Sequence, residues 1–194
     1  IRAREFATVN RAQLNIRIVN LSLGHPILAP AADDPLVQAV ESAVRAGLVV
    51  TVSAGNRGKN PVTGVIGYAG ISSPGNAPSA ITSGATDTKE TANRSDDTVA
   101  NYSSRGPSWL DGFAKPDVLA PGHKLVSLTD ADSYLYQNYP QFRRNIDGQA
   151  YLALSGTSMA SAVTAGVVAT VLEAYQWYAW YAPEPPTPTA VKAM

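Results

Sequence analysis

The chain has 194 residues, of which 45% are hydrophobic, and this is enough for one domain with a substantial core. Fifteen basic and fifteen acidic side chains cancel, so the charge gives no reason to expect a nucleic acid or a membrane surface as a partner. The absence of cysteine excludes disulfides, thiolate zinc sites and a cysteine nucleophile, and no run of about 18 consecutive apolar residues predicts a membrane helix.

Helical and strand patterns alternate along the first part of the chain. The helical stretches carry apolar residues three or four positions apart, and the strand stretches are short β-branched runs typical of buried parallel strands. The predicted elements are a helix over 1–14, a strand over Ile16 to Leu23, a helix over Pro35 to Ala46 and a strand over Leu48 to Ser53. Asp33 or Asp34 is expected near the start of the second helix, and Gly47 at its end.

The middle of the chain begins with a long segment rich in Gly, Pro, Asn and Ser, from Gly55 to Pro78. This composition predicts a functional loop rather than a linker between domains. Two further strands are predicted, over Ala80 to Ala85 and over Asp117 to Ala120. The alternation of helices and strands indicates an α/β fold with a partial doubly wound parallel sheet of about four strands and flanking helices.

The composition changes again between residues 128 and 153, where tyrosines and arginines accumulate. We interpret this segment as an insertion, with a possible hairpin through Tyr139 and Pro140. The whole chain, 1–194, is expected to form a single domain. Its parts are a strand and helix core over 1–127, the insertion over 128–153, a helix with an aromatic end over 154–182 and a tail over 183–194.

Residues Ser155 to Ala160 read Ser-Gly-Thr-Ser-Met-Ala and precede an unbroken small and apolar run, Val163 to Leu172. Together with four other blocks in matching order, this segment resembles the nucleophile region of the subtilisin-like serine proteases, the subtilase family. The four blocks are Ile18 to Gly24, Val49 to Asn56, Asn101 to Pro107 and Lys115 to Gly122. The resemblance covers nearly the whole chain and implies the subtilase α/β fold.

The resemblance implies that Ser158 is the catalytic nucleophile. A serine at a helix N-terminus lies beside free backbone N–H groups, which favour an oxyanion, although such a serine also serves as an ordinary N-cap. Asn56 matches the side-chain donor of the family's oxyanion hole, and its alternative role is that of a turn residue before Arg57.

Two backbone segments match those that flank the family's primary specificity pocket. Extended backbone at a cleft pairs with a substrate strand, although the same residues also read as the ends of core strands. The implied substrate-binding residues are Ser22, Leu23, Gly24, Ser53, Ala54 and Gly55.

The family's Asp-Thr/Ser-Gly and His-Gly-Thr blocks are not found before Leu21, so the chain resembles the C-terminal half of a catalytic domain. The histidines are His25 and His123, and neither has the family's catalytic context. His25 is the better candidate for a recruited base, because a serine nucleophile needs a neutral imidazole within hydrogen-bond reach. Acidic pairs occur, but converging oxygen ligands are not evident, so neither a metal nor another cofactor is predicted.

Two residues depart from the family pattern. Ala162 stands where the family usually has proline, and Ser83 stands where a β-branched residue is usual. Neither change prevents the fold, but neither favours a well-maintained active site.

The resulting expectation is a subtilase-like serine hydrolase fragment with weak or absent proteolysis, acting on a peptide or a small ester. The alternatives are an esterase for activated esters and a non-catalytic binding or assembly module. An open edge at Ile16 to Leu23 predicts self-association or pairing with a complementary N-terminal half. The resemblance also implies an extracellular location.

Overall fold

The computed structural model describes residues 2–177 and 184–194. The strands of its main sheet pair in the order β1-β2-β3-β4. β5 also pairs with β3, along the side opposite β2. The strands are β1 Ile18–Leu21, β2 Val49–Ser53, β3 Ile81–Asp87, β4 Thr98–Val99 and β5 Val118–Pro121. β1, β2, β3 and β5 are parallel, and the unpredicted β4 is antiparallel to β3. The predicted α/β class with four parallel strands is therefore confirmed.

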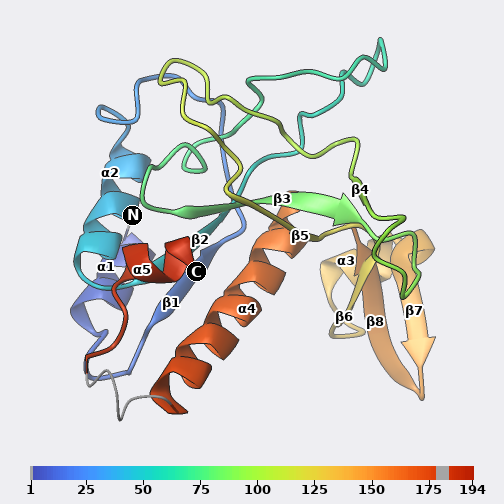
Figure 1. Ribbon diagram of the computed structural model, residues 1–194. Helices are drawn as coiled ribbons and strands as arrows, with labels where there is room; N and C mark the ends of the chain where they lie inside the picture. The colour runs from blue at the N-terminus through green and yellow to red at the C-terminus, as the bar shows by residue number, and fades with distance from the viewer. Residues whose placement is uncertain (1, 178–183) are drawn as a thin grey trace.

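Helices cover both faces of this sheet (Figure 1). α1 Arg2–Val9 and α2 Pro35–Arg45 lie on one face, and α4 Thr157–Trp177 and α5 Pro188–Ala193 lie on the other. All five residues of β2 are buried. Val50 and Val52 pack in the cluster that includes α2, whereas Val49 packs with Val168 of α4, so successive side chains serve opposite faces.

The first helix is shorter than predicted, because it ends at Val9 rather than near residue 14. The Asn10 side chain donates to the carbonyl oxygen of Phe6 at 2.8 Å, an interaction by which asparagine competes with helical backbone bonds. Asn15 then adopts a positive φ of 50° before the chain enters β1. The second helix begins as expected, and its N-cap is Asp34.

The predicted insertion forms a separate small sheet with the order β6-β8-β7 (Figure 1). Its elements are β6 Leu125–Leu128, α3 Tyr134–Asn138, η1 Pro140–Phe142, β7 Arg143–Ile146 and β8 Gln149–Leu154. The hairpin turn lies at Asp147 and Gly148, with φ of 51° and 78°, and not at Tyr139 and Pro140 as predicted. Asp-Gly suits a tight hairpin turn with two positive φ values, whereas Pro140 starts the short 3₁₀ helix η1.

The longest helix, α4, is the one element among the described residues that is long and apolar enough to cross a membrane. In this fold it packs along β1, β2, β3 and β5, and 33% of its most apolar stretch is buried. The aromatic end predicted after Trp177 lies largely outside the described residues. The C-terminal tail contains the short helix α5, and Thr187 is its N-cap.

Candidate active site

The carboxyl ends of β1 and β2 meet the N-terminus of α4 at one edge of the main sheet. Parallel α/β sheets place ligand sites at this edge, beyond the carboxyl ends of the strands. A cleft of about 370 Å³ lies here. The residues that line it are Ser22, Leu23, Gly24, Ser53, Gly55, Asn56, Arg57, Ser72, Thr157 and Ser158.

The structure thus brings seven of the eight predicted catalytic and substrate-binding residues to one cleft. The eighth, Ala54, is fully buried behind it: its N–H donates to Ser83 and its carbonyl oxygen accepts from Ser72. Arg57, Ser72 and Thr157 are additions. Arg57 and Thr157 adjoin Asn56 and Ser158 in the sequence, whereas no motif pointed to Ser72.

Ser158 lies in the first turn of α4 and is half-buried. Its carbonyl oxygen accepts a hydrogen bond from Ser22 Oγ at 2.8 Å, and its own Oγ donates to the carbonyl oxygen of Ser22 at 3.5 Å. These two contacts fix the start of α4 against the end of β1. The Ser158 hydroxyl therefore faces the cleft beside the positive end of the helix.

The amide of Asn56 is oriented by the residue before Ser158. Asn56 Oδ1 accepts from the backbone N–H of Thr157 at 3.0 Å and from Thr157 Oγ1 at 3.1 Å. Because the oxygen is held on this side, the Nδ2 group is left to donate elsewhere. An anion bound at the N-terminus of α4 would find such a donor close by.

Thr157 also contacts the opposite wall, because its Oγ1 accepts from the backbone N–H of Gly55 at 3.1 Å. Gly55 has a φ of 106°, and a Cβ atom there would lie only 2.5 Å from Ser72 Oγ. Only glycine fits this conformation and this space. The strand end, the oxyanion candidate and the nucleophile candidate are therefore held by one threonine.

A polar network at Asn20 supports the site from behind and was not recognised from the sequence. Asn20 Oδ1 accepts from Thr51 Oγ1 at 3.1 Å and from Ser161 Oγ at 2.6 Å, and its Nδ2 donates to Ser22 Oγ at 3.0 Å. The network ties β1 to β2 and to α4. The available signal was one polar residue inside the β-branched run Ile18 to Leu21.

Ser83, which stands where the family usually has a β-branched residue, forms a hydrogen bond to α4. Ser83 on β3 is fully buried, and its Oγ donates to Thr164 Oγ1 of α4 at 2.9 Å. Thr164 Oγ1 in turn donates to the carbonyl oxygen of Ala160 at 3.0 Å. Both hydroxyl donors therefore have an acceptor, and serine is accommodated between the sheet and the helix.

Neither of the two histidines, both within the described part of the chain, lines the Ser158 cleft. His25 Nδ1 lies 2.7 Å from the carbonyl oxygen of Pro26, and its Nε2 lies 3.9 Å from Asp34 Oδ2. His123 instead lies near Tyr102, with a ring separation of 6.0 Å. Recruitment of His25 as a base would therefore require its ring to leave these partners.

Metal chemistry finds no support in side-chain grouping. Among residues 2–177 and 184–194, no three His, Asp or Glu side chains gather in a way that could hold a metal ion. The acidic pairs seen in the sequence remain separate from the cleft, whose one charged lining residue is Arg57.

The comparisons with known proteins agree with this geometry. A family model described as the subtilase family matches residues 3–193. The chain is 44% identical over 160 residues to serine protease AprX of Bacillus subtilis, covering 81% of this chain and 34% of that protein. It is 34% identical over 168 residues to subtilisin DY of Bacillus licheniformis, covering 87% of this chain and 45% of that protein.

Solved structures give the same result. The S41 psychrophilic protease has a TM-score of 0.64 and 27% identity, covering 98% of this chain and 52% of that one. Sphericase has a TM-score of 0.65 at 24% identity, which shows the fold, and the match covers 99% of this chain and 52% of that one. This chain thus spans about half or less of the length of these relatives. On the family model, the sequence identity and the shared fold, it belongs to the subtilase family of serine peptidases.

Proposed function

We propose that this chain carries the nucleophile half of a subtilase-type serine hydrolase, with Ser158 as nucleophile and Asn56 as oxyanion donor. Ser158 Oγ would attack the carbonyl carbon of a peptide or ester and lose its proton to a base. The tetrahedral oxyanion would be held by Asn56 Nδ2 and by N–H groups at the start of α4. Departure of the leaving group gives an acyl-enzyme, and water then releases the acid.

The observation that carries this proposal is the pair of hydrogen bonds from Thr157 to the side chain of Asn56. The backbone N–H and the hydroxyl of Thr157 both donate to Asn56 Oδ1, at 3.0 and 3.1 Å. Asn56 Nδ2 lies 3.4 Å from where a Cβ atom on Gly156 would stand, two residues before Ser158. An asparagine that served only as a turn residue would not need its oxygen fixed from a distant helix.

Neither histidine lines the cleft, so a base for the proposed reaction would have to come from a displaced His25 ring or from a segment that carries the family's His block. Without a triad, roughly 10³- to 10⁴-fold acceleration over water remains from the oxyanion hole and binding, a value established on subtilisin itself. An activated ester needs little protonation of its leaving group, whereas a peptide bond needs much. We therefore expect esterase activity on activated esters and very weak proteolysis from residues 1–194 alone.

The test is hydrolysis of a short-chain p-nitrophenyl ester by the purified chain and by Ser158→Ala. We expect Ser158→Ala to abolish the turnover, and Asn56→Ala to lower it by roughly 100- to 1,000-fold, the range known for subtilisin itself. His25→Ala tests whether His25 is a recruited base. A drop equal to that of Ser158→Ala would give His25 this role, and an unchanged rate would exclude it. If Ser158→Ala retains the full rate, Ser158 is not the nucleophile.

A second candidate function, assembly, is favoured by the edge of the main sheet. Within the described residues, β1 pairs with β2 along one side and has no strand along its other side. Such an edge is a template for a further strand. We propose that β1 pairs with a second copy of this chain or with a segment that carries the family's Asp and His blocks.

The assembly proposal is tested by sedimentation of the chain over a range of concentrations. We expect concentration-dependent association that Ile18→Pro reduces. The N–H of Val49 donates to the carbonyl oxygen of Arg17, so Ile18, which is paired with Val49, has its own N–H on the open side of β1, and proline removes that donor. A wild-type chain that stays monomeric at high concentration contradicts the self-association form of the proposal. An extracellular site of action accompanies the hydrolase proposal.

A further inference from the structure

A second and larger cleft lies away from Ser158. Its volume is about 580 Å³, and it shares no lining residue with the Ser158 cleft. This volume falls within the range of pockets that hold small organic molecules. Nothing in the proposed hydrolase chemistry uses this cleft.

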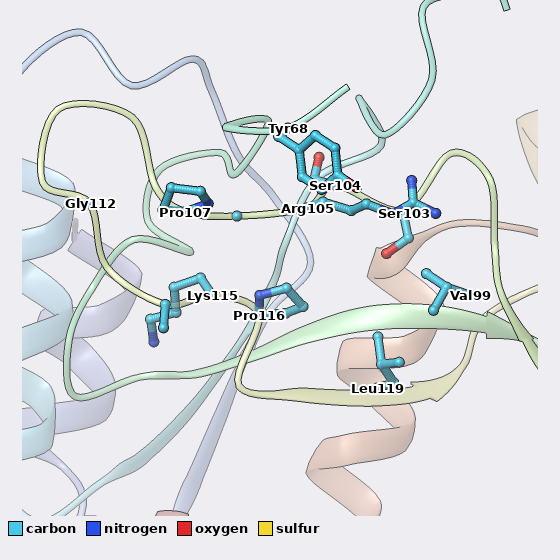
Figure 2. A pocket seen from close by; sticks show the side chains of 12 residues that line it. Tyr68, Val99, Ser103, Ser104, Arg105, Pro107, Gly112, Lys115, Pro116 and Leu119 are labelled. Carbon is cyan, nitrogen blue, oxygen red and sulfur yellow. The ribbon is translucent and has the colours of Figure 1, made fainter. Parts of the chain in front are cut away.

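The walls of the second cleft are largely apolar. Figure 2 shows the side chains of Tyr68, Val99, Pro116 and Leu119 arranged around Arg105. Tyr68, Leu119 and Val99 are 73%, 47% and 41% exposed, which leaves much apolar surface in contact with water. The aromatic face of Tyr68 and the apolar ring of Pro116 suit a planar apolar group.

Arg105 gives the cleft its charge. Its Nη1 donates to the carbonyl oxygen of Gly58 at 3.2 Å, which fixes the side chain but uses one of five N–H donors. No acidic residue belongs to the described lining of the cleft. The other cation of the lining, Lys115, points away from Arg105 (Figure 2), and its Nζ lies 2.6 Å from Asp117.

Two buried serines beside Arg105 give this part of the wall a fixed shape. Ser103 Oγ accepts from the backbone N–H of Ala85 at 3.0 Å, and Ser104 Oγ accepts from that of Arg57 at 3.0 Å. Both serines line the cleft, and both are nearly inaccessible to water. The segment that presents Arg105 is therefore anchored to β3 and to the loop after β2.

From these observations we infer that the second cleft binds a small aromatic carboxylate. The carboxylate pairs with the free donors of Arg105, whose planar fork matches two carboxylate oxygens. The ring lies against Tyr68, Pro116 and Leu119 and removes their surface from water. A cationic ligand is disfavoured, because the described lining offers Arg105 and Lys115 but no carboxylate.

Phenylacetate is the test ligand, and binding is measured by calorimetry and by shifts of backbone amide signals on the purified chain. We expect saturable binding at millimolar concentrations, with the largest shifts around Arg105 and Leu119. Arg105→Gln should weaken binding roughly 10- to 100-fold, because a charge-assisted pair is lost. Arg94→Gln is the matched control, since Arg94 is an exposed arginine outside the cleft, and it should bind as the wild type does.

A second variant covers the case in which Arg105→Gln fails to fold. Val99→Glu places a carboxylate on the exposed rim of the cleft and should repel phenylacetate, while its unfolding midpoint stays near that of the wild type. The inference is overturned if phenylacetate shows no saturable binding, if phenylacetamide binds as tightly, or if a folded Arg105→Gln or Val99→Glu binds without loss. Because the readout is binding, it does not depend on Ser158 being a nucleophile.

Discussion

Thr157 is the residue that connects the two sides of the candidate active site. Its Oγ1 donates to Asn56 Oδ1 and accepts from the N–H of Gly55. We predict that Thr157→Val lowers the rate of ester hydrolysis about 2- to 10-fold, which corresponds to the loss of one neutral hydrogen bond. Thr157→Ser keeps the hydroxyl and should retain most of the rate. Equal rates for the valine and serine variants would contradict an orienting role for the hydroxyl.

Asn20 is a second residue that connects several elements around the site. Its Oδ1 satisfies the hydroxyls of Thr51 and Ser161, both fully buried. Asn20→Ala removes this acceptor, but Asn20 is exposed and water can take its place, so we predict a loss of about 1–2 kcal/mol in the free energy of unfolding. Urea denaturation measures this loss.

Asn20→Asp is the matched control for that measurement, because aspartate keeps the acceptor oxygens and gives up only the donation to Ser22. We expect it to stay closer to the wild type than Asn20→Ala does. The hydroxyl acceptor would not be the stabilising group if the two variants lost the same free energy.

The sequence motifs located the candidate residues but not the hydrogen bonds that orient them. Ser158 and Asn56 were found because they lie in short contiguous motifs. The bonds that orient them join residues 101 and 136 positions apart, such as Thr157 to Asn56 and Ser22 to Ser158. A single sequence does not report such distant pairs, because only the folded chain brings them together.

The N-terminus of α2 is held by one buried carboxylate. Asp34 Oδ1 accepts from the N–H groups of Leu36 and Val37, and Oδ2 accepts from Ser73 Oγ at 2.6 Å. We predict that Asp34→Ala lowers the free energy of unfolding by about 2–4 kcal/mol, since a cap is lost and the Ser73 hydroxyl loses its acceptor. The exposed neighbour Asp33→Ala should change stability by less than about 0.5 kcal/mol in the same urea titration.

The same carboxylate has a predictable pH dependence. Burial acts to raise the pKa of Asp34, but the hydrogen bonds from Ser73, Leu36 and Val37 outweigh it, so the pKa lies below its ordinary value of 3.8. The unfolded chain therefore takes up this proton at a higher pH than the folded chain does. The stabilisation is present above pH 3.8 and is lost as the pH falls through the folded value. Asp34→Asn should remove this part of the acid sensitivity.

The elements that the sequence predicted well are those with strong local patterns. β2 is a run of four β-branched residues that ends at Ser53, and β3 starts with the β-branched pair Ile81 and Thr82, so both strands were recognisable within one or two residues. β4 has two residues and β6 has four, which is too short for a period-two pattern to identify a strand, and both are mostly exposed. The hairpin was misplaced because Pro140 was favoured as a turn residue over Asp147 and Gly148, which form the turn.

On the scale of the whole molecule, one charged cluster joins the C-terminal helix to the sheet. Lys192 of α5 donates to the carbonyl oxygens of Pro78 and Ala80 and lies 3.0 Å from Asp117 Oδ1. Lys115 donates to Asp117 Oδ2 at 2.6 Å and to Ala80. The C-terminal helix therefore meets the segments that lead into β3 and β5 around a single carboxylate, although these five residues span more than a hundred positions in sequence.

Mutation of Asp117 and mutation of Lys115 should lower the stability by different amounts. The Lys115 side chain is 3% exposed, and Asp117 is its one carboxylate partner among the ion pairs of the described residues. Asp117→Asn leaves a buried ammonium without its counter-charge, and we predict a loss of about 3–5 kcal/mol at neutral pH. Lys115→Met removes the buried charge while Asp117 keeps Lys192 and the N–H of Thr82, so its loss should be much smaller.

The pH dependence of stability tests whether the buried charge of Lys115 causes the loss in Asp117→Asn. Burial lowers the pKa of Lys115 to about 8, against the opposing pull of Asp117, while an unfolded lysine keeps its ordinary value of 10.5. Between these values the unfolded chain holds more protons, so the contribution of Lys115 to stability rises with pH. Urea titrations at neutral pH and near pH 9.5 should show the Asp117→Asn variant recovering stability as Lys115 loses its proton. Lys115→Met should lack this rise, and a rise of equal size in that variant would assign the effect to other groups.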